Sequence, residues 1–144
     1  MVDNTTSKLF RTLARVFSFY ELNPHVVSED LDNWKDIPFS IKHGVYIIKH
    51  NDDILYIGQG RVKRRQKHHI DNITGENLIT ETSSKNGRTK STKAWEYIRE
   101  SYKPEVKNCK VYYMDCITKY DAIAVEGALI KFLMPLANEE TFNK

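Results

Sequence analysis

The sequence predicts an α+β fold with a small three-stranded sheet, antiparallel or mixed, that is flanked by helices. Two runs of apolar and aromatic residues, 45–48 and 54–57, predict a hairpin because turn residues separate them. A third run, 110–116, predicts another strand, and apolar residues at helical spacing before and after these runs predict helices. With 144 residues and 40% hydrophobic content, the chain suits one globular core.

The first forty residues are expected to form a helical extension ahead of the main domain. Apolar residues recur at helical spacing between Leu9 and Tyr20, so a helix is expected over 6–21. Two prolines predict an irregular connection over 23–40, with one short helical turn near Leu31. The expected division is an N-terminal helical extension, 1–40, and a main domain, 41–144.

The hairpin is expected to place two tyrosines on one face of the sheet. With a three-residue loop at 51–53, Ile48 lies opposite Tyr56 and Tyr46 lies opposite Gly58. A two-residue loop would put the tyrosines on opposite faces. Cross-strand packing alone also explains such a pair, but two phenols beside basic side chains suit proton transfer next to a phosphate.

Three further helices are expected after the hairpin. A basic run over 61–69 predicts the first, and core spacing predicts the second over 92–102. A capping box over 118–121 opens the third helix, which carries Glu126 among small and apolar residues. A buried carboxylate needs a lysine, a proton or a divalent cation as its partner. The polar stretch 71–93 is expected to be a loop that contacts substrate.

Positive charge is concentrated in two segments. The formal net charge is only +3, yet 61–67 and 85–93 together contain nine Lys or Arg and no acid. A charge run is often only a solvated face, but such segregation favours a polyanion as partner. The residues expected to bind DNA are Arg61, Lys63, Arg64, Lys67, Lys85, Arg88, Lys90 and Lys93.

Several classes of protein are disfavoured by the sequence. It shows no signal-peptide pattern and no apolar run long enough for a membrane span, so a cytoplasmic protein without a membrane partner is expected. Cys109 and Cys116 fit neither a zinc pair nor a disulfide framework, which predicts two reduced thiols. The five histidines form no zinc-binding motif.

Gly44-Val45-Tyr46 and Tyr56-Ile57-Gly58, followed by an arginine, a histidine, a glutamate and an asparagine, resemble the signature of the GIY-YIG nuclease family. The resemblance covers roughly residues 43–139 and implies that family's fold. It implies an endonuclease that hydrolyses phosphodiester bonds in DNA with Mg²⁺, or alternatively Mn²⁺. The catalytic residues that it implies are Tyr46, Tyr56, Arg65, His69 and Glu126. Arg64 and His68 share the i,i+4 spacing of Arg65 and His69, so the register stays open by one residue.

The resemblance also implies a role for each of these residues. Tyr46 would take the proton of the attacking water, helped by His69 or Tyr56. Arg65 would hold the scissile phosphate, and Glu126 would bind one metal ion at the leaving oxygen. The pKa of an unperturbed tyrosine is about 10, so the neighbouring arginines are expected to favour the Tyr46 phenolate. The residues expected to support the site are Asn138 and Gly58.

Small restriction-type enzymes and phage enzymes that degrade or nick DNA are the relatives that the chain resembles most in size. A phage enzyme of this kind would act in the host cytoplasm. The alternatives are a catalytically inactive DNA-binding module of the same fold, or a homing-type or structure-specific nuclease. One active site cuts one strand, so double-strand cleavage would call for sequential nicking or for a homodimer or homo-oligomer, with the N-terminal helix as the expected contact.

Overall fold

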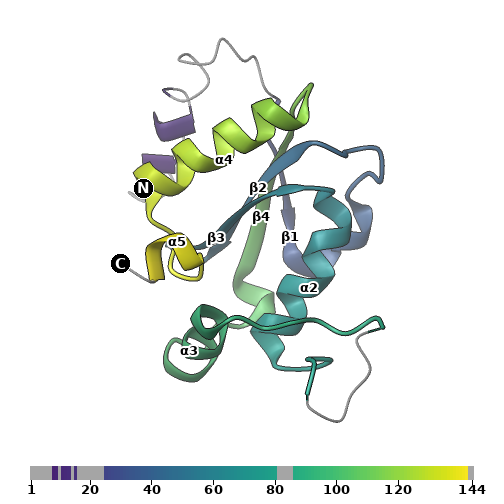
Figure 1. Cartoon of the computed structure of the whole chain (residues 1–144), viewed down its shortest axis with the longest axis vertical. Helices are drawn as coiled ribbons and strands as arrows, with labels where there is room; N and C mark the ends of the chain where they lie inside the picture. Colours follow the sequence, from purple (N-terminus) through teal and green to yellow (C-terminus); the bar gives the residue numbers. More distant parts are fainter. Residues whose placement is uncertain (1–7, 10, 14, 16–24, 81–85, 143–144) are drawn as a thin grey trace.

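A four-stranded antiparallel sheet forms the centre of the computed structural model, which describes residues 8–9, 11–13, 15, 25–80 and 86–142. The strand order is β1-β4-β2-β3, and helices lie on both sides of the sheet (Figure 1). The strands are β1 (Val27–Asp30), β2 (Gly44–His50), β3 (Asp53–Gly60) and β4 (Cys109–Asp115). The α-helices are α2 (Val62–Thr74), α3 (Lys93–Ser101), α4 (Lys119–Leu133) and α5 (Glu139–Phe142), and the 3₁₀ helices are η1 (Leu31–Asp36) and η2 (Val106–Asn108).

The α+β prediction is confirmed, but the sheet has four strands rather than three. Residues 27–30, expected in an irregular connection, form β1 and pair with β4 along its outer edge. Leu31 and Ile37, just after β1, are buried in the core. The helical turn expected near Leu31 is confirmed as η1. A strand of four residues with only half-buried apolar positions leaves little periodicity to detect.

The remaining predicted elements agree closely with the structure. Of the predicted helix 6–21, residues 8–9, 11–13 and 15 are helical, and the rest lies outside the described residues. Helix α2 continues past its predicted end near residue 70, because Ile73 is buried and the left-handed Gly75 ends the helix. The predicted division at residue 41 stays a prediction, although β1 hydrogen-bonds into the same sheet.

The pairing of β2 with β3 confirms the predicted partners of both tyrosines. Tyr46 lies opposite Gly58, and Tyr56 lies opposite Ile48. The predicted three-residue loop is wrong, because β3 begins at Asp53 and only two residues connect the strands. By simple alternation, a two-residue loop would have separated the two rings.

A β-bulge in β3 explains why the tyrosines still share a face. The register shifts between Ile48 and Lys49, which leaves Leu55 as the additional residue of β3. Leu55 and Tyr56 consequently both pack on the side of the sheet that contains Tyr46. A bulge inserts one residue into one strand of a pair, so it offsets the residue missing from the loop.

Each face of the sheet has its own core. On one face, α4 and the helical residues Leu9 and Leu13 pack against β-strand residues such as Val45 and Ile47. On the other, α2, α3 and η1 cover Tyr46 and Ile48. Thr118 accepts a hydrogen bond from the Asp121 amide and thereby caps α4, as the capping box predicts. In the described ranges, no helix has both the length and the apolar composition needed to cross a membrane.

Candidate active site

Tyr46 and His69 form the centre of the candidate site. Tyr46 of β2 is 1% exposed, and its hydroxyl lies 2.7 Å from Nε2 of His69 on α2. Burial lowers the pKa of His69 to about 3, with a further contribution from Arg65, so the imidazole is neutral at pH 7. A neutral imidazole has one donor and one acceptor nitrogen, so the Tyr46 O–H can donate to Nε2 in the tautomer that carries its proton on Nδ1.

Gly58 makes the position of the Tyr46 ring available. It lies directly opposite Tyr46 in the hairpin, and a Cβ atom at residue 58 would overlap the Tyr46 hydroxyl and ring. A rigid ring that is almost completely buried has no room to move aside. The second glycine of the motif is thus required by the first tyrosine rather than by its own backbone angles.

A group of stacked aromatic rings surrounds this hydrogen bond. The Tyr56 ring lies 4.4 Å from the His69 ring and 5.8 Å from the Trp95 ring, centroid to centroid. Trp95 is 2% exposed, as the prediction of a core role for it requires, but it also contacts His69. The rings of Tyr46, Tyr56 and Trp95 hold the His69 imidazole in place and limit the access of water to it.

The structure decides which of the two Arg-His pairs faces the tyrosines. His69 contacts Tyr46, and Arg65, one helical turn earlier, is close enough for its charge to lower the pKa of Tyr46. His68 turns away from Tyr46, and its Nδ1 lies 2.9 Å from the Thr89 hydroxyl. The Arg65 and His69 register therefore matches the geometry.

The expected effect of the arginines on Tyr46 is wrong in net direction. Burial raises the pKa of Tyr46 well above its ordinary value, and the charges of Tyr56 and Glu126 raise it further. Only Arg65 acts in the opposite direction. Tyr46 is consequently a neutral phenol at pH 7, because the loss of hydration outweighs one nearby guanidinium.

Glu126 belongs to α4, which packs on the opposite face of the sheet from Tyr46. Its side chain is half-buried, and its charge influences the pKa of Tyr46. Within the part of the chain that the structure describes, no group of three or more His, Cys, Asp or Glu side chains forms a cage for a metal ion. Mg²⁺ is often held by one or two carboxylates together with substrate phosphates and water, and the Glu126 carboxylate fits that mode.

Asn138 supports the site by pairing with the free edge of β3. Its side-chain carbonyl accepts from the Ile57 amide at 2.9 Å, and its amide donates to the Ile57 carbonyl at 2.8 Å. The amides of Leu136 and Ala137 donate to the preceding carbonyls of the same strand. The 136–138 segment thus satisfies the edge strand that carries Tyr56.

The sequence analysis missed a buried hydrogen-bonded chain on the outer side of α2. The Thr89 hydroxyl donates to the Asp71 carboxylate at 2.6 Å, so its oxygen is left to accept from Nδ1 of His68. Asp71 and Thr89 are both buried. The two residues are separated by a polar loop, and no local pattern in the sequence predicts their contact.

A cavity of about 300 Å³, here called the tyrosine cavity, opens over these side chains. Its walls include Tyr46, Tyr56, Arg65 and His69, and Arg88 and Lys90 from the polar stretch. Among the other residues expected to bind DNA, Lys63 lies over the Phe39 ring, Lys67 donates to the Gly87 carbonyl, Lys93 is exposed, and Lys85 lies outside the described residues. Arg61 and Arg64 line a second cavity together with Arg65.

The site therefore combines side chains from β2, β3 and α2 with the segment that covers the edge of β3, and Glu126 of α4 acts on it through its charge. In comparisons with protein-family models, curated proteins and solved structures, nothing matched this chain. Its function is accordingly inferred from the chemistry of the site.

Proposed function

We propose that this chain is a Mg²⁺-dependent endonuclease of the GIY-YIG family that hydrolyses phosphodiester bonds in DNA. The observation that carries the proposal is the Tyr46 to His69 hydrogen bond, with Arg65 and Glu126 within electrostatic reach of the same phenol. A proton acceptor, a phosphate-binding cation and a metal-binding carboxylate are what hydrolysis of a phosphodiester requires.

The hydrogen bond provides a route for the proton of the attacking water. As a neutral phenol, Tyr46 accepts a proton from water only while it passes its own proton to Nε2 of His69. The hydroxide that forms then attacks phosphorus, and His69 holds the proton as an imidazolium. Burial disfavours that cation in the free protein, whereas the negative charge of a bound phosphate stabilises it.

Arg65 is the group best suited to hold the scissile phosphate. Its side chain lines the tyrosine cavity and is exposed to solvent at its mouth. A guanidinium binds two phosphate oxygens at once and so fixes the orientation of phosphorus relative to Tyr46. A Mg²⁺ ion held at Glu126 would stabilise the negative charge that develops on the leaving oxygen.

Basic side chains on both sides of the tyrosine cavity support cleavage within a strand rather than from its end. Arg88 and Lys90 lie on one side, and Arg61 and Arg64 lie beyond Arg65 on the other. A strand held on both sides of the reacting phosphate passes through the site. Within this class, we favour a restriction-type or a phage DNA-degrading or nicking enzyme.

The proposal is tested by incubating the protein with supercoiled and linear duplex DNA, in Mg²⁺ or in EDTA, and separating the products on a gel. Cleavage that needs Mg²⁺ and is absent from Glu126→Ala supports the proposal. Discrete fragments would indicate sequence specificity, and nicked circles or a smear would indicate a nicking or degradative enzyme. Retarded but uncut DNA would instead favour a binding module without catalysis, and full activity in a folded Glu126→Ala protein would refute the metal assignment.

A further inference from the structure

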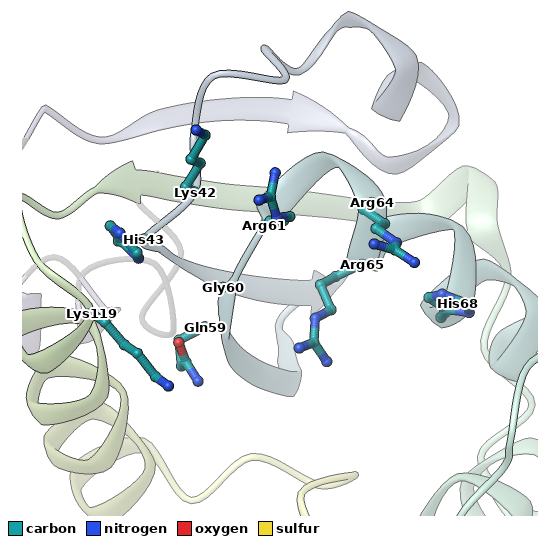
Figure 2. Close-up of a pocket in the computed structure, with 9 residues that line it drawn as sticks. All are labelled: Lys42, His43, Gln59, Gly60, Arg61, Arg64, Arg65, His68 and Lys119. Atoms are coloured by element: carbon teal, nitrogen blue, oxygen red, sulfur yellow. The ribbon is translucent and has the colours of Figure 1, made fainter.

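A second cavity of about 540 Å³ lies beside the tyrosine cavity, and Arg65 lines both (Figure 2). We call it the cationic cavity, because five of its lining residues are positively charged at pH 7. These are Lys42, Arg61, Arg64, Arg65 and Lys119. Every residue that lines it lies in the described part of the chain, and none of them is an aspartate or a glutamate.

The five cations come from three separate segments of the chain. Lys42 precedes β2, the three arginines belong to the start of α2, and Lys119 is the first residue of α4. In Figure 2 the Lys119 ammonium, the Gln59 amide and the Arg65 guanidinium surround one open space. A basic helix with one solvated face would account only for the three arginines. Lys42 and Lys119 come from other segments, so the fold brings the residues of this cavity together.

The location of Lys119 is unfavourable for its own helix. A cation in the first turn of a helix opposes the macrodipole and so destabilises the helix slightly. Like charges that line one concave surface also repel one another. Neither arrangement stabilises the folded protein, whereas an anion in the cavity would offset both costs.

A bend of the backbone forms the floor of the cationic cavity. Gly60 has a φ of +122°, in a region that side chains disfavour, and it joins β3 directly to α2. This bend places Gln59, Arg61 and Arg65 around the same space. The floor therefore offers amide and guanidinium donors next to the ammonium of Lys119, which is a donor set suited to phosphate oxygens.

We infer that the cationic cavity binds backbone phosphates of the DNA strand next to the scissile phosphate. The inference rests on the proposed function, because it assumes that the scissile phosphate is held at Arg65. Since Arg65 belongs to the walls of both cavities, a strand that leaves the tyrosine cavity past Arg65 enters the cationic cavity directly. Lys42 and Lys119 thus extend the DNA contact beyond the residues that the charge runs predict.

The test compares two double variants that lose the same charge. Lys42→Ala/Lys119→Ala removes two cations of the cationic cavity. Lys110→Ala/Lys131→Ala removes two exposed lysines elsewhere, the second of them at the far end of the same helix α4. Binding of a fluorescein-labelled duplex is measured by anisotropy in EDTA at several KCl concentrations, and cleavage of plasmid DNA in Mg²⁺ is measured in parallel.

We expect the cavity variant to bind about tenfold more weakly and the slope of log K against log salt to become shallower by roughly 2, because each phosphate contact contributes about 0.9. The control variant should retain the slope of the wild type. Thermal unfolding should show that Lys119→Ala is at least as stable as the wild type, which a structural role for this lysine would not allow.

The possible outcomes separate this inference from the proposed function. Equal salt slopes for the wild type and the cavity variant would overturn the inference even if the wild type cuts DNA. An equal loss of DNA affinity in both double variants would overturn it as well. A shallower slope confined to the cavity variant supports the inference if the wild type cuts DNA. Without cleavage, the same slope would show that the cavity binds phosphates but would overturn its assignment beside a scissile phosphate. A wild type that neither binds nor cuts would refute the proposed function, and the inference with it.

Discussion

In the proposed mechanism, the Tyr46 to His69 hydrogen bond would couple catalysis to folding, because both partners are buried. That mechanism requires a neutral imidazole as the proton acceptor for Tyr46, and burial in the aromatic cluster is what keeps it neutral. The same burial makes protonation of His69 unfavourable in the folded protein without a bound phosphate. At this scale, protonation affects activity and stability through one side chain.

Acidification is expected to destabilise the protein through His69. The pKa of this side chain is about 3 in the folded protein and about 6.5 when unfolded, so below pH 6.5 the unfolded chain binds the additional proton. The stabilisation is complete above pH 6.5 and is lost as the pH falls toward 3. Between pH 7.5 and 5, the free energy of unfolding measured in urea should fall by about 2 kcal/mol more for the wild type than for His69→Gln. Equal losses would contradict a buried neutral His69.

Tyr46→Phe is expected to abolish cleavage without unfolding the protein. The substitution keeps the ring that packs beside Gly58 and removes only the hydroxyl that is hydrogen-bonded to His69. Loss of a proton-transfer group lowers rates by about 10²–10⁴-fold. Cleavage rates in Mg²⁺ check this result, with urea unfolding to confirm the fold. Tyr97→Phe, at an exposed position of α3, is the matched control and should cut at the wild-type rate.

At the scale of elements, strand β3 contributes Tyr56 and Gly58 to the site. Two local features set the position of this strand. The bulge at Leu55 turns Tyr56 toward Tyr46, and the 136–138 segment hydrogen-bonds along its outer edge. The sequence predicts the hairpin and the shared face of the tyrosines. It does not predict the loop length, because alternative loops differ by one residue and a bulge cancels the difference.

Asn138→Ala is expected to destabilise the protein by about 1–3 kcal/mol. The substitution leaves both the amide and the carbonyl of Ile57 without their side-chain partner, in a buried position where water cannot replace it. Urea unfolding provides the measurement. Asn108→Ala, at an exposed asparagine of η2, should change stability by less than about 0.5 kcal/mol. If the two variants were equally stable, the role of Asn138 in supporting β3 would be wrong.

At the scale of the whole molecule, the contacts that the sequence fails to predict are those between distant segments. Helix periodicity predicts α2 and α4. The order of the signature residues predicts Tyr46, Tyr56, Arg65 and His69 as members of the site. No local pattern predicts that β1 joins β4, that Thr89 meets Asp71, or that Lys42 and Lys119 line one cavity. Each of these contacts depends on how a loop folds back, and loop conformations are only weakly encoded by residue type.

Removal of residues 1–40 is expected to prevent stable folding, although the sequence analysis treats them as an extension. Such a truncation exposes the outer edge of β4 and removes the fully buried Leu31 from the core. A chain that begins at Lys8 keeps these contacts and is the control. Circular dichroism and size-exclusion chromatography compare the two. A monomeric, cooperatively unfolding 41–144 fragment would show that the predicted division is a true domain boundary.

The bulge at Leu55 makes the shared face of the two tyrosines independent of small changes in hairpin length. The turn is one residue shorter than alternation requires, and β3 is one residue longer, so the two irregularities cancel at Tyr56. An insertion after Asp52 would lengthen the turn but leave His50 opposite Asp53, and deletion of Leu55 would remove the bulge but leave Tyr56 opposite Ile48. A single-residue change at either place should therefore keep both tyrosines on one face of the sheet.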